Sequence, residues 1–201
     1  LLAITALAVT GMGLMEQSMA LLVERVWVLP EHGGVASAIT HKQSAAMTAV
    51  VLVVVGLASA IVQGGFLGRL TRRYGERALV RAGAALATVA LGLSPVAAIV
   101  GSYPLLVAVG GGVLAAGTAL LYPSTNAFVS RSVPATEQGR WLGIGQSLSA
   151  LGRTLGPALA GVLFSAHALL PFGVAAALTL VAVAFAFALR PLQASEPKPT
   201  D

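Results

Sequence analysis

The chain has 201 residues, of which 57% are hydrophobic and only 9% charged, and its mean hydropathy is +0.88. Soluble domains carry about 25% charged residues, so this composition excludes a water-soluble protein and indicates one embedded in a lipid bilayer. The net charge of +5 gathers around one loop, which argues against a nucleic-acid partner, and the absence of cysteine excludes disulfides, thiol catalysis and cysteine metal sites.

Six apolar stretches follow one another along the chain, each near the length of about 20 residues that a bilayer-crossing helix needs. They predict an all-α membrane protein with spans at about 1–28, 45–67, 78–100, 104–129, 141–164 and 168–189. A polar tail at 190–201 follows, which we expect to be cytoplasmic and disordered. Because Leu1 already lies in an apolar run, we also expect the chain to be a fragment of a longer protein.

The second and third predicted spans are joined by a basic loop at 68–77. This loop contains a single acid, Glu76, and four arginines, Arg69, Arg72, Arg73 and Arg77. Lysine and arginine near the ends of spans resist translocation across the membrane. The loop is therefore predicted to be cytoplasmic, and an even number of spans places both ends of the chain on the same side.

The loop sequence G-R-L-T-R-R-Y-G-E-R resembles a loop motif of the major facilitator superfamily, roughly G-x-L-x-D-R-x-G-x-R. The matching residues are Gly68, Leu70, Arg73, Gly75 and Arg77, while Arg72 stands where the family has aspartate. Since loss of that aspartate is common in the second copy of the motif, the chain resembles the C-terminal six-helix half of such a transporter. The resemblance implies a missing N-terminal six-helix half and a gating loop formed by Gly68, Arg72, Arg73, Gly75 and Arg77.

The fifth predicted span carries a stripe of small residues at helical spacing. Its members are Gly145, Ser149, Gly152, Gly156 and Ala160, and small residues allow another helix to approach closely. Gly152, Gly156, Pro157 and Gly161 also resemble the Gly-Pro signature of the superfamily's antiporters. Helix packing with a proline kink explains the same residues equally well, so both interpretations stay open.

Six polar residues inside the predicted spans are candidates for a substrate or proton pathway: Glu16, Gln17, Tyr122, Asn126, Gln146 and Arg153. Charged groups are costly in a membrane and usually face protein or water. Glu16 is the only acid well inside a span, so we predict that it is protonatable and linked to transport. Structural roles remain open for Glu16 as a neutral packing element, and for Tyr122 and Asn126 beside Pro123.

These features predict transport of a small molecule across a membrane by alternating access, as proton-coupled efflux of drug-like or metabolite substrates. The expected setting is the bacterial inner membrane, and the expected partners are lipid, protons, the substrate and the missing half. No cofactor, metal or catalytic residue is predicted. A facilitator-type importer or symporter is the alternative. From a different class, a non-transporting structural membrane protein or an intramembrane enzyme built on Ser147 and His167 stays open.

Overall fold

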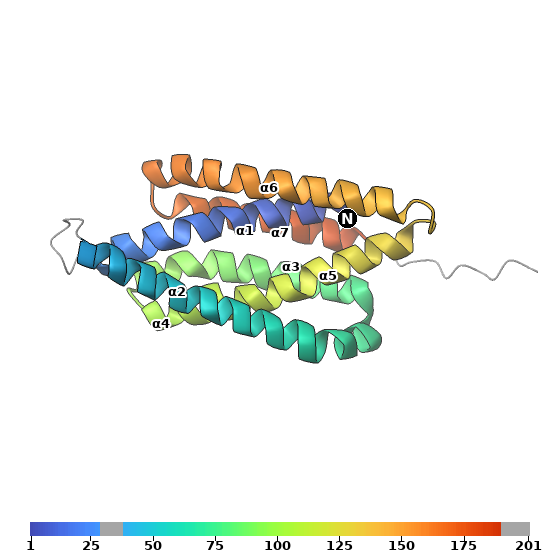
Figure 1. The fold of residues 1–201 in the computed structure, drawn as a ribbon, viewed down its shortest axis with the longest axis horizontal. Helices are drawn as coiled ribbons and strands as arrows, with labels where there is room; N and C mark the ends of the chain where they lie inside the picture. The colour runs from blue at the N-terminus through green and yellow to red at the C-terminus, as the bar shows by residue number, and fades with distance from the viewer. Residues whose placement is uncertain (29–37, 190–201) are drawn as a thin grey trace, which may run out of the picture.

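The computed structural model describes residues 1–28 and 38–189, so the expected tail at 190–201 and the linker at 29–37 lie outside the described residues. The described part folds into helices joined by short connections and contains no strand (Figure 1). The predicted all-α membrane fold is confirmed.

The helices cover the apolar stretches, but α2 begins at residue 38 and α3 at residue 67, well before the predicted starts at 45 and 78. The first is α1 (Leu2–Val23), which continues into the π-helical turn η1 (Glu24–Val28). The remaining elements are α2 (Ala38–Ile61), η2 (Val62–Phe66), α3 (Leu67–Ile99), α4 (Tyr103–Leu106), η3 (Val107–Val113), α5 (Leu114–Ser132), α6 (Gln138–Ala166) and α7 (Leu170–Ala188).

Five helical segments of the described chain are long and apolar enough to cross a membrane. They are Leu2–Val28, His41–Ile99, Tyr103–Ser132, Gln138–Ala166 and Leu170–Ala188. The second segment contains Gly75, whose backbone is not helical, with φ at 76° and ψ at 160°. The chain turns back at this residue, so that α2 and the main part of α3 form two separate rods (Figure 1).

The basic segment at 68–77 is more helical than the predicted loop. Helix continues from η2 through Tyr74 and resumes after Gly75, and Gly68 lies inside the helix with no atom within 4 Å of a Cβ added there. A positive φ is unfavourable for residues with a Cβ. The reversal of the chain therefore depends on Gly75 and does not require Gly68.

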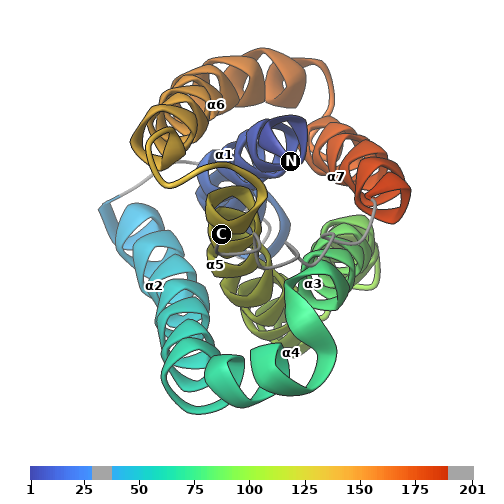
Figure 2. The same ribbon diagram turned by 90° about the vertical axis from the view of Figure 1, so that its right-hand side faces the viewer.

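Among the helices, α1 and α5 lie towards the middle of the bundle (Figure 2). The closest packing of α1 is against α6 and α7, and that of α3 is against α5 and α7. α2 makes fewer contacts, mainly with η3 and α5. On one side of the bundle α2 and α6 lie apart from each other (Figure 2).

The contact between α1 and α6 is a close approach of two backbones. The buried residues of α6 are Ser149, Gly152, Gly156 and Ala160, which belong to the small-residue stripe read from the sequence. A Cβ placed on Gly156 would lie 2.9 Å from the Cα atom of Gly13, and one on Gly152 would lie 2.8 Å from the hydroxyl oxygen of Thr10. At Gly156 the obstruction is backbone, which leaves room only for glycine, whereas at Gly152 the nearest obstruction is the side chain of Thr10.

A second close approach, which the sequence analysis did not anticipate, joins α3 to α5. A Cβ on Gly83 would lie 2.7 Å from the carbonyl oxygen of Gly117, and a Cβ on Gly117 would lie 2.8 Å from the backbone nitrogen of Ala87. In lipid there is little hydrophobic drive between helices, so van der Waals contact of this kind holds them together.

Arg81 connects α3 to the end of α7. Its Nε atom donates to the carbonyl oxygen of Ala186 at 3.0 Å, and its Nη2 atom donates to that of Phe187 at 2.8 Å. The last carbonyls of a helix lack partners within the helix, and a cation there interacts favourably with the helix dipole. Arg81 therefore fixes the C-terminal end of α7 against the bundle.

We predict that Gly156→Leu destabilises the protein and that Ala158→Leu does not. Overpacking costs about 1–3 kcal/mol, and the obstruction at Gly156 is backbone that cannot move aside, whereas Ala158 is exposed on the opposite side of α6. Thermal unfolding of the purified variants in detergent measures the difference. Equal midpoints for the two leucine variants would contradict the packing described for α1 and α6.

Candidate functional site

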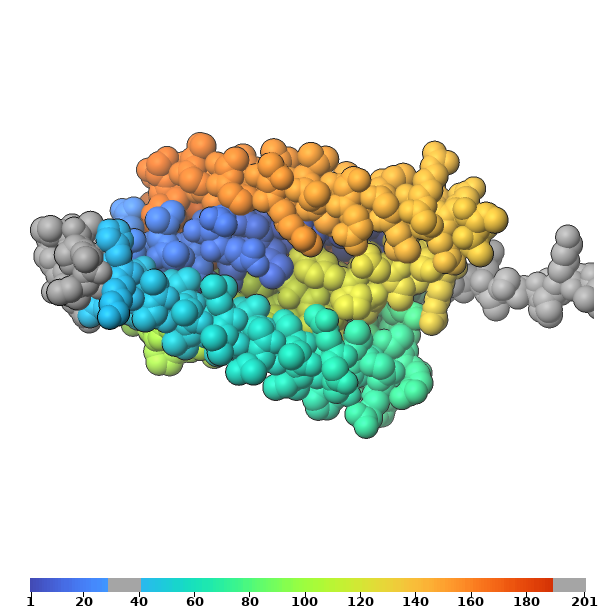
Figure 3. All heavy atoms as spheres, viewed as in Figure 1, coloured from blue at the N-terminus to red at the C-terminus, as the bar shows by residue number. Residues whose placement is uncertain are grey.

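The open side of the bundle is hollowed between α6 and α2, with α1 and α5 visible in the hollow (Figure 3). Within it lies a pocket of about 310 Å³. Its lining residues are Val9, Met12, Gly13, Glu16, Tyr122 and Arg153. Three of the six predicted pathway residues, from three different helices, thus share one pocket.

The three polar residues are brought together by the packing of their helices. Glu16 lies near the middle of the Leu2–Val28 segment, and Arg153 lies on α6 between Gly152 and Gly156, the two glycines that touch α1. Tyr122 comes from α5, one residue before Pro123. The side chain of Arg153 is therefore held beside α1 by the same contact that packs α6 onto the bundle.

Glu16 and Arg153 interact electrostatically but are not directly paired. Their charges influence each other, yet no carboxylate oxygen of Glu16 lies within 4.0 Å of a guanidinium nitrogen of Arg153. Both side chains are exposed to the space of the hollow. The hydroxyl of Tyr122 donates to the sulfur of Met12 at 3.4 Å. The pocket thus presents a carboxylate and a guanidinium with space between them.

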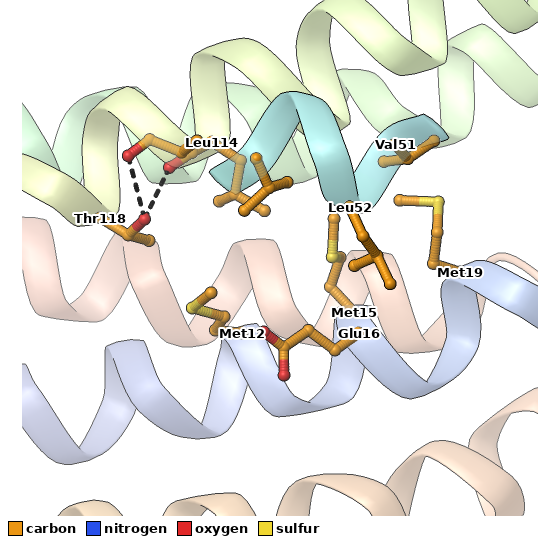
Figure 4. Close-up of a pocket in the computed structure, with 10 residues that line it drawn as sticks. Met12, Met15, Glu16, Met19, Val51, Leu52, Leu114 and Thr118 are labelled. Carbon is orange, nitrogen blue, oxygen red and sulfur yellow. Dashed lines mark hydrogen bonds between the residues drawn. The ribbon is translucent and has the colours of Figure 1, made fainter. Parts of the chain in front are cut away.

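A narrow apolar cleft adjoins this pocket between α1, α2 and α5 (Figure 4). It is lined by Met12, Met15, Glu16, Met19, Val51, Leu52, Val55, Leu114, Ala115 and Thr118, and holds about 20 Å³ of space accessible to water. The hydroxyl of Thr118 donates to the carbonyl oxygens of Leu114 and Ala115, at 3.1 and 3.2 Å. Apart from Glu16, the cleft therefore offers only apolar contacts.

The other three predicted pathway residues lie elsewhere. Gln17, Asn126 and Gln146 are exposed and line neither the pocket nor the cleft. Asn126 lies one turn beyond Tyr122 on α5, and Gln146 lies two turns before Arg153 on α6. Gln17 follows Glu16 directly but lies about 100° round α1 from it, and so belongs to a different face of the helix.

The predicted gating residues surround the turn at Gly75. Arg72 and Arg73 are exposed, and Arg77 is half-buried just after the turn. Arg73 lies over the ring of Tyr74, 5.4 Å from its centroid, and the ion pair of this region is formed by two residues outside the predicted set. An oxygen of Glu76 lies 2.8 Å from a guanidinium nitrogen of Arg131, so an ion pair joins the start of the helix after Gly75 to the end of α5.

The predicted packing motif on α6 divides into two parts. Gly152 and Gly156 contact α1, whereas Gly161 is exposed and has no atom within 4 Å of an added Cβ. Pro157 lies inside α6, and the helix continues beyond it to Ala166. Gly161 follows Gly156 by five residues and so lies about 140° round the helix from it, on a face that does not meet α1.

The arrangement does not support an intramembrane enzyme. The hydroxyl of Ser147 donates to the carbonyl oxygen of Gly143 at 3.0 Å, and Nδ1 of His167 accepts from the backbone nitrogen of Leu169 at 3.2 Å. These two side chains belong to opposite ends of α6, so His167 cannot activate Ser147. No group of three potential metal ligands occurs among the described residues.

Helices of membrane-spanning length with an acid and an arginine in a hollow on one side are an arrangement expected of a transporter. The chain matches the Major Facilitator Superfamily over residues 4–201, and it belongs to this superfamily. This membership, which the loop motif had suggested, places the chain among membrane transporters and not among enzymes.

A similar curated protein is Solute carrier family 22 member 18 of Mus musculus. It is 29% identical over 119 residues, which cover 59% of this chain and 28% of that relative. The matched region thus spans well under a third of the relative's length. Its name describes a solute carrier, in agreement with the superfamily.

We predict that Gly75→Ala destabilises the protein whereas Gly68→Ala does not. A residue with a Cβ in this backbone region costs about 1–3 kcal/mol, while alanine inside an open helix stabilises by about 0.5–1 kcal/mol relative to glycine. Thermal unfolding of the two purified variants, compared with wild type, provides the measurement. A Gly75→Ala midpoint at or above that of Gly68→Ala would show that the turn does not require glycine.

Proposed function

We propose that this chain is the C-terminal six-helix half of a proton-coupled antiporter that exports a small molecule. Residues Glu16, Tyr122 and Arg153 form part of the path of the substrate and the proton. The observation that carries the proposal is the single pocket lined by all three side chains. Ionisable residues at such depth are costly and are retained mainly where they serve transport.

Proton coupling follows from the different chemistry of the two charged groups. A carboxylate can gain a proton when its surroundings become less polar, whereas the guanidinium of arginine keeps its charge. The distance between Glu16 and Arg153 exceeds 4.0 Å, so a shift of α6 relative to α1 would change their interaction. Movement of the helices and protonation of Glu16 are coupled in this way.

The missing half completes the transport site. The hollow between α2 and α6 (Figure 3) is open on one side, and alternating access needs a second wall that rocks against the first. A six-helix half packed across the hollow would close the pocket. The resemblance of Gly152–Pro157 to the antiporter signature supports exchange, while a symporter would use the same pocket with proton and substrate bound together.

The proposed setting is the bacterial inner membrane, with both ends of the chain in the cytoplasm. The cluster of arginines around Gly75 and Arg131 at one end of the bundle supports the proposed orientation. Positive charge at the ends of spans is retained on the cytoplasmic side. At the opposite end of the bundle, the connection between α3 and α4 around Gly101 contains no charged residue.

We predict that Glu16→Gln abolishes transport driven by a pH gradient in the complete protein. The amide has the shape of the carboxyl group but cannot release a proton, so the protein should still fold while proton coupling is lost. Glu137→Gln is the matched control, because Glu137 is exposed at the start of α6 and accepts a hydrogen bond only from Trp141 at 3.1 Å. Substrate-dependent proton release from proteoliposomes is the measurement.

Two results would contradict the role of Glu16. Wild-type rate and pH dependence in the Glu16→Gln variant would make Glu16 a packing element and move the proton site elsewhere. Substrate that moves in the same direction as the protons, instead of in the opposite direction, would favour the symporter.

We predict that an impermeant thiol reagent applied from outside cells labels Ser102→Cys but not Arg73→Cys. The chain contains no native cysteine, so each variant carries one thiol, and both sites lie at the ends of rods. Opening the cells should expose position 73. Labelling of position 73 in intact cells would reverse the proposed orientation.

A further inference from the structure

The pocket and the apolar cleft meet at two residues, Met12 and Glu16, which line both. A ligand bound at Glu16 therefore contacts polar groups on one side and methionine side chains on the other. The pocket volume of about 310 Å³ is at the small end of the range of about 300–1,000 Å³ for small-molecule sites. The part of the site that this chain forms therefore suits a compact amphipathic group, and the proposed second half would line its other side.

The charges of the pocket restrict the ligand further. Glu16 and Arg153 face the same space without pairing with each other, and each is left needing an opposite charge in a medium that solvates ions poorly. A purely cationic ligand would lie beside the permanent charge of Arg153. A purely anionic ligand would lie beside the carboxylate of Glu16.

We propose that this pocket binds a compact zwitterion with an apolar side group, its cationic group at Glu16 and its anionic group at Arg153. A carboxylate or similar planar anion can accept two parallel hydrogen bonds from the guanidinium. This inference rests on the proposed function, since it takes the pocket as the substrate site, and it adds the chemical class of the substrate.

The apolar group of the ligand is directed to the methionines of α1. The cleft beside Met12, Met15 and Met19 is nearly filled, with about 20 Å³ accessible to water, so an entering ring or branched chain must displace side chains. Methionine has three rotatable bonds and rearranges at low cost. The pocket can thus accept ligands with different apolar groups, provided that they carry both charges.

Exchange with a proton follows from the same arrangement. The ligand's cation and a proton compete for Glu16, so binding of one releases the other. The ionisable groups that face Glu16 in the pocket are Arg153 from α6 and Tyr122 from α5. α7, which also packs on α1, contains no ionisable residue, and those of α2, His41 and Lys42, lie at its first turn.

Three ligands with the same phenyl group test the proposal: phenylalanine, phenethylamine and 3-phenylpropanoate, which are a zwitterion, a cation and an anion at pH 7. Binding of each to the complete protein in lipid nanodiscs is measured by isothermal titration calorimetry without a pH gradient. Phenylalanine should bind about tenfold or more tightly than either analogue, as expected when one charge-assisted contact is lost.

Two variants identify which residue binds which charged group of the ligand. Arg153→Gln should bring the affinity for phenylalanine down to that for phenethylamine, and Glu16→Gln should bring it to that for 3-phenylpropanoate. The control variants Arg140→Gln and Glu137→Gln alter exposed residues that do not line the pocket, and should keep the wild-type preference. Elution of each variant as a single species on size exclusion shows that it is folded.

Equal affinity for the three ligands, a preference for either singly charged ligand, or no measurable binding of phenylalanine would overturn the zwitterion inference. None of these results affects proton-driven transport that depends on Glu16, which is measured separately in proteoliposomes. Conversely, a preference for phenylalanine that Glu16→Gln removes supports the inference even where pH-driven transport is unchanged in that variant.

Discussion

The close approach of α1 and α6 at Gly13, Gly152 and Gly156 is the contact on which the candidate site depends. Helices in lipid gain little from burying apolar surface against each other, because lipid chains are equally apolar. Their association relies on backbones that come near enough for extensive van der Waals contact. A side chain at Gly156 would meet the backbone of Gly13 and separate the two helices.

This contact also fixes the chemistry of the hollow. Arg153 lies between the two contacting glycines of α6, so the distance between the helices sets how near its guanidinium comes to Glu16 on α1. Tyr122 on α5 completes the pocket, and α5 is itself held against α3 by Gly83 and Gly117. Two pairs of glycine contacts therefore determine where the three polar side chains of the pocket lie.

The end of the bundle that carries the basic segment is organised by charges instead of glycine packing. Glu76 pairs with Arg131 across the start of the helix after Gly75 and the end of α5, and Arg81 binds the last carbonyls of α7. These interactions tie together helix ends that lie outside the most closely packed region. This chain thus combines closely packed helices at its centre with polar connections at this end.

The sequence by itself determined the all-α membrane class, because hydrophobic length and scarcity of charge are properties of composition and spacing. It also showed that Gly152 and Gly156 share a helix face with Ser149 and Ala160, since helical periodicity is local. Only the tertiary structure decided that this face meets α1, that Gly75 alone makes the turn, and that Glu16, Tyr122 and Arg153 enter one pocket while Gln17, Asn126 and Gln146 do not. Periodicity tells which residues share a face, but the partner of that face depends on complementary surfaces far away in the chain.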